Sequence, residues 1–191
     1  MNPQGDPLLL VTVGTDHHPF DRLVQWVDGW LATPGGCAAG LHCLMQTGTS
    51  APPTGSAAGW QDYLEFEVLQ AAMRDAAAVV CHGGPGTILG ARHMGTVPIV
   101  VPRRRRLGEH VDDHQVAFSR RLAAEGSVFL AETEADLHRL LDRVATEPAA
   151  FRARFEHRGT ATAVRAFERL VDDLVAGRPT PRQEIPDEVV R

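Results

Sequence analysis

Short apolar runs alternate with amphipathic stretches along most of this chain, and this alternation limits its fold more strictly than any other feature. Continuous runs of branched and aliphatic residues are typical of strands that are buried on both faces of a parallel sheet. Such runs lie at Leu8–Val13, Leu41–Gln46, Ala77–Cys81, Val97–Val101 and Val128–Ala131. Because helical stretches separate them, we expect an α/β protein: a single Rossmann-like domain with a parallel, doubly wound sheet and Leu8–Val13 as its central strand.

Between these strands, apolar side chains recur with the spacing of helices. The predicted helices are Asp21–Leu31, Glu67–Asp75, Thr87–Met94, Val111–Ala124, Glu134–Ala145 and Thr160–Val175. In Glu67–Asp75, Val68 and Met73 are expected to face the core. A short strand is predicted at Tyr63–Phe66, and loops at Thr33–Gly40 and Thr47–Gly59. We expect residues 1–176 to form one domain and residues 177–191 a polar tail.

Composition excludes several classes of protein. The formal net charge is −5 over 191 residues, so no basic field favours nucleic acid as a partner. The cysteines Cys37, Cys43 and Cys81 form no metal-type pairs, and residues 1–7 carry neither a basic cluster nor an apolar run. No apolar run approaches the roughly 20 residues needed to span a bilayer. These features predict a reduced, cytoplasmic protein.

The segment His82-Gly83-Gly84-Pro85-Gly86-Thr87 stands where the predicted strand Ala77–Cys81 gives way to a helix. The start of a helix leaves backbone N–H groups without partners and carries partial positive charge, so phosphate binds there readily. Glycines let a phosphate approach the backbone, while Thr87 offers a hydroxyl and His82 a ring N–H. The alternative is a tight turn with a packed histidine. A ligand is favoured because the loop at Gly14 emerges at the same edge of a doubly wound sheet.

Three motifs in a fixed order extend this interpretation: His82-Gly-Gly-Pro-Gly-Thr87, then Gly95 and Pro98, then Asp112-Asp-His-Gln115. Together they resemble the carboxyl-terminal, donor-binding half of family 28 glycosyltransferases of the GT-B type. The resemblance runs from about Leu8 to Ala145. It is closest to separate chains that constitute this half alone, such as the catalytic subunit of a UDP-N-acetylglucosamine transferase and bacterial exopolysaccharide transferase subunits.

This resemblance implies one half of a GT-B fold and an inverting glycosyltransferase. The enzyme would move N-acetylglucosamine or another hexose from a UDP-sugar to a lipid-linked acceptor in polysaccharide or glycolipid synthesis. A membrane-associated partner subunit would supply the acceptor-binding half and recruit the chain to the inner face of the membrane. The UDP-sugar is then a substrate, and no further cofactor is implied. The implied nucleotide-sugar contacts are Gly14, Thr15, His82, Gly83, Gly84, Gly86, Thr87, Asp112, His114 and Gln115.

Two of these contacts have a second interpretation. The resemblance places Asp112 and Gln115 against hydroxyls of the donor sugar, since a carboxylate and an amide offer complementary acceptors and donors. The spacing Asp112-x-x-Gln115 also matches a capping box, which would satisfy the N–H groups of a helix start and stabilise it by about 1 kcal/mol.

One position departs from the family pattern. Many relatives have a glutamate that grips the ribose hydroxyls early in the helix after the glycine-rich turn, and this chain has Gly90 there. A glycine cannot make that clamp. We expect the backbone or another carboxylate such as Glu109 to serve instead, or the nucleotide preference to differ.

The candidate catalytic residues are histidines. His82 would donate to the leaving diphosphate, and His17, beside His18, would act as general base because histidine titrates near neutrality. The other histidines, His110 among them, show no metal-ligand spacing, so no catalytic metal is expected.

A run of four arginines follows the predicted strand Val97–Val101. It is either a solvated loop or a contact with an anionic acceptor or a partner subunit. The residues concerned are Arg103, Arg104, Arg105 and Arg106.

Two other functions are considered beside transfer. A non-catalytic nucleotide-sugar-binding or regulatory module is compatible with Gly90. A dinucleotide-dependent oxidoreductase is disfavoured, because the turn from Gly14 to His18 lacks the Gly-x-Gly-x-x-Gly pattern.

Overall fold

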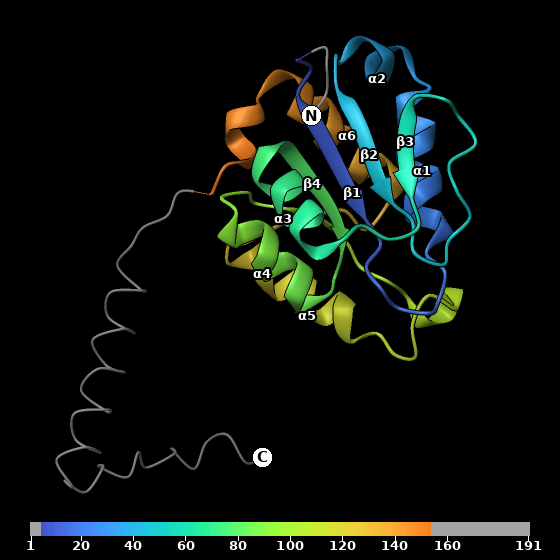
Figure 1. Cartoon of the computed structure of the whole chain (residues 1–191). Coiled ribbons are helices and arrows are strands. Elements are labelled where there is room, and N and C mark those ends of the chain that lie inside the picture. The colour runs from blue at the N-terminus through green and yellow to red at the C-terminus, as the bar shows by residue number, and fades with distance from the viewer. Residues whose placement is uncertain (1–4, 154–191) are drawn as a thin grey trace, which may run out of the picture. The chain divides into compact units, whose positions relative to one another are not determined.

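A computed structural model of the chain describes residues 5–153, and in these residues a six-stranded parallel sheet forms the centre (Figure 1). Its strands are β1 (Leu8–Thr12), β2 (His42–Gln46), β3 (Ala58–Gln61), β4 (Ala76–His82), β5 (Ile99–Val101) and β6 (Phe129–Leu130). They lie in the order β3-β2-β1-β4-β5-β6, with β1 at the centre as predicted. The α/β, Rossmann-like, doubly wound architecture is therefore confirmed.

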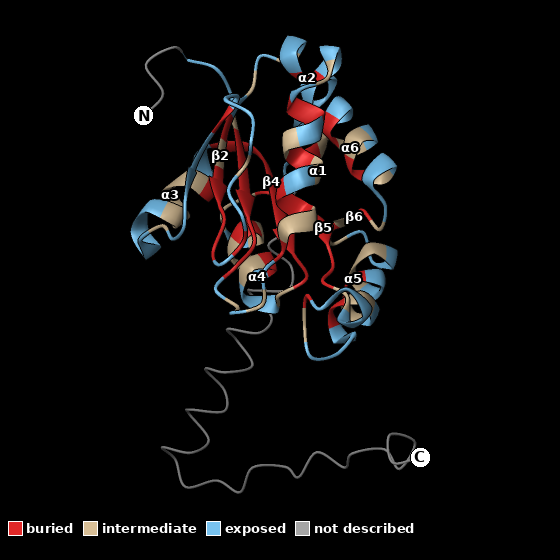
Figure 2. Cartoon of the chain, turned by 90° about the vertical axis from the view of Figure 1, so that its right-hand side faces the viewer, coloured by how far each residue is buried: buried red, intermediate tan, exposed pale blue. Residues whose placement is uncertain are grey.

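Helices cover both faces of this sheet, and each face has its own apolar core. The cores divide β1 residue by residue: Leu9 and Val11 pack on one side and Leu10 on the other, as expected for successive side chains of a strand. One face is covered by α1 (Asp21–Leu31), α2 (Pro34–Ala38) and α6 (Glu134–Thr146), and the other by α3 (Phe66–Asp75), α4 (Pro85–His93) and α5 (His114–Ala124). Figure 2 shows buried residues on the strands and on the inward sides of the helices.

Two segments differ from the sequence prediction. The third strand lies at Ala58–Gln61 rather than Tyr63–Phe66, and Tyr63 is half exposed. Its sequence has little strand propensity, but it pairs in parallel with β2 at the sheet edge, and pairing overrides propensity. The stretch expected as a loop at Thr33–Gly40 contains the short helix α2, because the Thr33 hydroxyl accepts the Gly36 N–H and a proline begins the helix.

Smaller corrections concern single helices. Val68 is 50% exposed, so its predicted place in the core is wrong, whereas Met73 is buried. The helix predicted from Val111 begins only at His114. The predicted helix Thr160–Val175, the domain boundary at residue 176 and the polar tail lie outside the described residues. Within residues 5–153, no helix combines the length and apolar character needed to cross a bilayer.

Candidate anion-binding site

A cavity of about 240 Å³ lies at the carboxyl ends of β1, β2 and β4, where α4 begins. The sheet register brings these ends together, because Thr12 pairs with Gln46 on one side and with Cys81 on the other. The cavity is lined by Thr12, Gly14, Thr15, Gln46, Leu69, His82, Gly84, Gly86 and Thr87. Six of the ten predicted nucleotide-sugar contacts therefore line one cavity, whereas Gly83, Asp112, His114 and Gln115 do not.

Thr12, Gln46 and Leu69 also line the cavity but were not predicted as site residues. Gln46 is the last residue of β2. It is 2% exposed, and its amide nitrogen donates to the Gly14 carbonyl at 3.3 Å. A signal was present: a glutamine is the last residue of an otherwise apolar predicted strand, at the edge where ligands of doubly wound sheets bind.

The His82 ring lies against two glycines. A Cβ added to Gly14 would lie 2.4 Å from ring atom Cε1, and a Cβ added to Gly84 would lie 2.2 Å from Nε2. Gly14 also has a φ of +83°, which side-chain-bearing residues rarely adopt. These two glycines are therefore required by the protein's own packing around His82.

Gly86 differs from these glycines. It borders the cavity, yet a Cβ there would meet no atom within 4 Å. The fold therefore leaves open space beside Gly86, which is the second residue of α4.

Burial controls the charge of His82. Burial, and next the nearby positive charge of Arg103, lower the pKa of His82 to about 4. At neutral pH the ring is therefore uncharged and can donate one N–H. Its Nδ1 is buried and has no hydrogen-bond partner.

The start of α4 adds donors to the same cavity. Gly84 is the residue before the helix, Pro85 is its first residue, and no side chain caps the first turn. The N–H groups of that turn have no partners inside the helix, and the helix dipole places partial positive charge beside them. An anion is the ligand that this arrangement attracts.

Gln115 connects two loops of the site. It is 4% exposed, and its Oε1 accepts the N–H of Gly83 at 3.0 Å and that of Arg103 at 3.3 Å. At the start of α5, Oδ1 of Asp112 accepts the N–H of His114 at 3.1 Å, but the N-cap residue is Asp113 and the Gln115 side chain accepts from other loops. The reciprocal capping box of Asp112 and Gln115 is therefore wrong, although Asp112 does satisfy one N–H of the helix start. Asp112 and His114 are exposed and hydrogen-bond to each other.

The four arginines do not share one environment. Arg103 has no exposed surface: its guanidinium donates to the carbonyls of Val13 (2.8 Å), His18 (2.6 Å) and Glu109 (2.9 Å), and it lies over the Phe20 ring. Contact of Arg103 with an acceptor or partner is therefore excluded in this structure.

The other three arginines are more exposed than Arg103. Arg104 is partly buried and donates to the Glu132 carbonyl at 2.6 Å. Arg105 and Arg106 are exposed, so contact with an acceptor or partner stays a prediction for these two.

Glu109 is also occupied. It is 4% exposed, its two oxygens accept from Arg22 at 2.7 and 2.8 Å, and one of them also accepts the N–H of Arg104. The expectation that Glu109 replaces the missing ribose clamp is therefore wrong. Gly90 lies on α4, where an added Cβ would make an ordinary contact with Sδ of Met73 at 3.6 Å.

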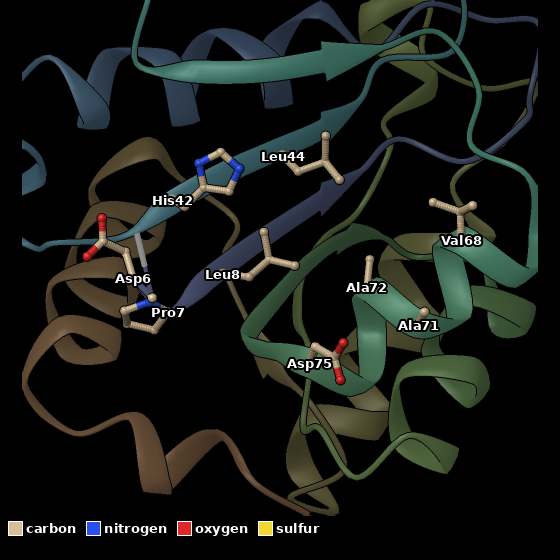
Figure 3. A pocket seen from close by; sticks show the side chains of 10 residues that line it. Asp6, Pro7, Leu8, His42, Leu44, Val68, Ala71, Ala72 and Asp75 are labelled. Atoms are coloured by element: carbon tan, nitrogen blue, oxygen red, sulfur yellow. The ribbon is translucent and has the colours of Figure 1, made fainter. Parts of the chain in front are cut away.

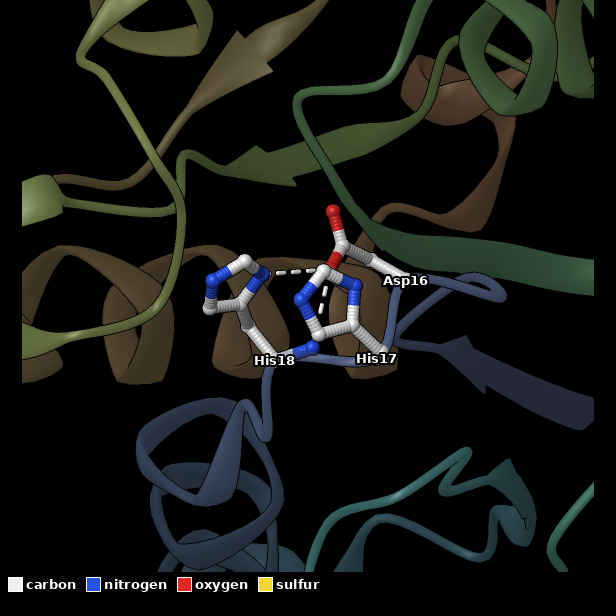
Figure 4. Close-up of side chains that lie close together, drawn as sticks. All are labelled: Asp16, His17 and His18. Atoms are coloured by element: carbon white, nitrogen blue, oxygen red, sulfur yellow. Dashed lines mark hydrogen bonds and ion pairs between the residues drawn. The ribbon is translucent and has the colours of Figure 1, made fainter.

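The candidate base His17 lies in the loop after β1 together with Asp16 and His18 (Figure 4). Its side chain is 84% exposed, and Nδ1 lies 3.4 Å from Oδ1 of Asp16. The same oxygen lies 2.7 Å from Nδ1 of His18. Burial raises the pKa of Asp16, but the hydrogen bonds from His18 outweigh this and lower it to about 2. His17 does not line the cavity, and a catalytic role for it stays a prediction.

A larger cavity, of about 670 Å³, lies at the opposite ends of the strands, between α3 and the amino ends of β1 and β2 (Figure 3). Leu8, Leu44 and Val68 give it a mostly apolar lining, with Asp6 and Asp75 at its border. None of the predicted site residues lines this larger cavity. The predicted residues that do line a cavity all line the smaller one, at the carboxyl ends of the strands, where ligands of open α/β sheets bind.

The fold and this site define the class of protein: a Rossmann-like domain of the kind that forms one half of GT-B glycosyltransferases. Within that class, the chain belongs to the glycosyltransferase family 28 C-terminal domain family, whose model matches residues 8–172.

Solved structures agree with this assignment at the level of the fold. The calicheamicin glycosyltransferase CalG4 is 18% identical, with a TM-score of 0.58 over 78% of this chain and 36% of its own. MurG from Acinetobacter baumannii is 19% identical, with a TM-score of 0.53 over 77% and 43%. The glycosyltransferase VinC in complex with dTDP is 21% identical, with a TM-score of 0.50 over 76% and 36%.

The chain therefore spans less than half the length of these structures. No curated protein matches the chain in a sequence comparison.

Proposed function

We propose that this chain binds the diphosphate of a nucleotide sugar in the 240 Å³ cavity and holds that molecule as the donor for glycosyl transfer. The observation that carries the proposal is the uncapped start of α4, which opens into the cavity beside Gly86. The fold leaves open space at Gly86, and a phosphate approaching the backbone would use it. Membership of the family 28 C-terminal domain supports the same ligand.

The chemistry follows from the charge that develops in the reaction. In an inverting transfer the diphosphate leaves as the acceptor hydroxyl attacks from the opposite side of the sugar. The N–H groups at the start of α4, the Thr87 hydroxyl and the neutral His82 ring are fixed donors for the charge on that leaving group. His82 acts here as an uncharged donor, because burial keeps it unprotonated at neutral pH.

The sugar would lie on the side of Asp112 and His114, whose exposed side chains can reach a ligand. Gln115 contributes differently, since its Oε1 is already used by two backbone N–H groups and only its Nε2 is left to meet a sugar oxygen. N-acetylglucosamine or another hexose fits the proposal. We propose UDP as the nucleotide because of the family resemblance. VinC was solved in complex with dTDP, so dTDP is the nucleotide to compare with UDP.

The acceptor half of the reaction is assigned to another subunit. The chain spans 36–43% of the length of the compared GT-B structures. We propose a membrane-associated partner that binds a lipid-linked acceptor and recruits this chain to the inner face of the membrane, with exposed Arg105 and Arg106 facing the partner or the anionic acceptor. His17 is the candidate base on this chain.

Donor binding is tested on the chain alone by calorimetric titration with UDP, UDP-N-acetylglucosamine and dTDP. Gly86→Ala should fold normally but bind the preferred nucleotide about tenfold or more weakly, because the added methyl enters the space that a phosphate needs. Gly29→Ala is the matched control: it is a helical glycine away from the cavity, and its Cβ would make only an ordinary contact at 3.8 Å. Binding of none of these nucleotides, or equal affinities for both variants, would contradict the proposal.

Transfer is tested by co-expression with a candidate membrane-associated partner and measurement of UDP release from several UDP-sugars with a lipid diphosphate acceptor. Release that requires partner, donor and acceptor supports the enzyme. Nucleotide binding without release in any combination supports the alternative that Gly90 favours, a non-catalytic nucleotide-sugar-binding or regulatory module.

A further inference from the structure

The loop that leads into α5 brings two histidines and an aspartate together. Nδ1 of His110 lies 3.4 Å from Oδ1 of Asp112, and Nδ1 of His114 hydrogen-bonds to the same oxygen. One nitrogen or oxygen from each of the three residues lies within 4.8 Å of the other two. Two imidazoles and a carboxylate are a donor set that zinc and related divalent transition metals prefer.

His110 is the most buried of these three residues, and a second carboxylate lies beside its ring. Nε2 of His110 faces Oδ2 of Asp16 at 3.5 Å, and the His110 side chain is only 14% exposed. Asp16 is itself fixed by the backbone N–H of His18 at 2.8 Å and by the His18 ring (Figure 4). Metal-binding histidines commonly hold their second ring nitrogen against a carboxylate in this way, which fixes the ring and its tautomer.

The other two members are open to an incoming ion. The side chains of Asp112 and His114 are 54% and 53% exposed. A metal ion could therefore reach them from solvent and complete its coordination with water, as three-ligand sites do.

A neighbouring group, Asp16, His17 and His18, has the same residue types and the same local pattern. In both groups an aspartate Oδ1 accepts the backbone N–H of the histidine two positions on and contacts that histidine's ring. The remaining histidine distinguishes the groups: the side chain of His17 is 84% exposed, whereas that of His110 is 14% exposed and lies against Oδ2 of Asp16. Because only His110 is fixed by a second carboxylate in this way, we take His110, Asp112 and His114 as the ligand set.

We propose that His110, Asp112 and His114 bind one divalent transition-metal ion, with Asp16 as the carboxylate behind His110. This site is distinct from the diphosphate cavity, whose lining includes none of the four residues. A bound ion would fix the loop between β5 and α5. It would also occupy atoms that the proposed function offers to the sugar, so the test uses protein free of donor.

The experiment measures uptake of Zn²⁺ by equilibrium dialysis, and of Co²⁺ by visible absorption, on the full chain without a histidine tag. Wild type should take up one ion, with the Co²⁺ absorption of a nitrogen- and oxygen-ligated site. His110→Ala and His114→Ala should each lower the affinity about tenfold or more, and Asp16→Asn should lower it in the same direction. His93→Ala removes an exposed histidine on α4 and should change nothing. Circular dichroism without metal confirms that each variant is folded.

Two results would overturn the assignment. One is the absence of stoichiometric uptake by the folded wild-type protein. The other is uptake that survives in both His110→Ala and His114→Ala but is lost in His17→Ala, which would place the ion on the loop after β1. Neither result bears on nucleotide binding, so this proposal can fail while the proposed function stands.

Discussion

Arg103 should be one of the most important residues for the stability of the domain, although its run of arginines was predicted to be either a solvated loop or a contact with an acceptor or partner. Its guanidinium donates to three carbonyls, and the bonds to Val13 and Glu109 are buried. Arg103→Met keeps most of the length and the apolar contact with Phe20 but leaves these carbonyls without a donor.

The size of the effect follows from those two buried carbonyls. Each buried polar group that loses its partner costs roughly 1–3 kcal/mol, so the variant should lose about 4 kcal/mol of unfolding free energy. That is a large share of the roughly 5–15 kcal/mol that stabilises a typical domain. For a chain of this size, the melting temperature should fall by about 8–16 °C.

The assay is urea unfolding followed by tryptophan fluorescence. Trp30 is a suitable probe because it is buried on α1 in the same apolar core as Phe20, which Arg103 contacts. Arg105→Met is the matched control from the same run: it is exposed, and its free energy of unfolding should stay within about 0.5 kcal/mol of wild type. If Arg103→Met and Arg105→Met are equally stable, the carbonyls around Arg103 do not depend on it and the reasoning is refuted.

Three further predictions concern residues around the cavity. Burial, and next the charge of Arg103, lower the pKa of His82 from 6.5 to about 4, so the stability that its neutral form contributes is present above pH 6.5 and is lost as the pH falls towards 4. The loss is at most roughly 3 kcal/mol, and stability curves of His82→Gln should lack that part of the pH dependence; parallel curves for variant and wild type would refute it. Gln115→Ala should lose about 2 kcal/mol in urea unfolding because two backbone N–H groups lose their acceptor, whereas exposed His114→Ala should not. Gly90→Glu should raise the melting temperature, since glycine is a poor helix former and only Met73 lies near the new Cβ. It should also raise affinity for UDP; a higher melting temperature with unchanged affinity would show that the carboxylate does not reach the ribose.

The parts of the fold that could be predicted are those whose neighbours are fixed by a repeated pattern. The helix Asp21–Leu31 was predicted with its observed bounds, because one apolar stripe faces the sheet. The strand before the glycine turn was predicted within a residue at each end, since all of β4 is buried. Strand β3 was misplaced because its hydrogen bonds to β2, rather than its own residues, hold it in the sheet.

The candidate site also has parts that could be predicted from the sequence and parts that could not. The glycine-rich turn and Gly14 were predicted because parallel topology brings strand ends together. The burial of Arg103 and Glu109 could not be predicted. Charged residues are seldom buried unless they are paired, and the partners of these two residues are distant in sequence. Arg103 depends on the carbonyl of Val13, 90 positions away, and Glu109 on Arg22, 87 positions away.

The geometry of the cavity depends on side chains that do not line it. Gln115 joins the turn after β4 to the loop after β5 by accepting from Gly83 and Arg103, and Arg103 then joins that loop to the end of β1 by donating to Val13. The three loops at the carboxyl ends of β1, β4 and β5 are therefore fixed to one another through one amide and one guanidinium. This is the arrangement that a preorganised donor site requires, because N–H groups stabilise a developing charge best when they need not move to meet it. It follows that Arg103→Met should weaken nucleotide binding even under conditions in which the variant is fully folded, although Arg103 does not border the cavity.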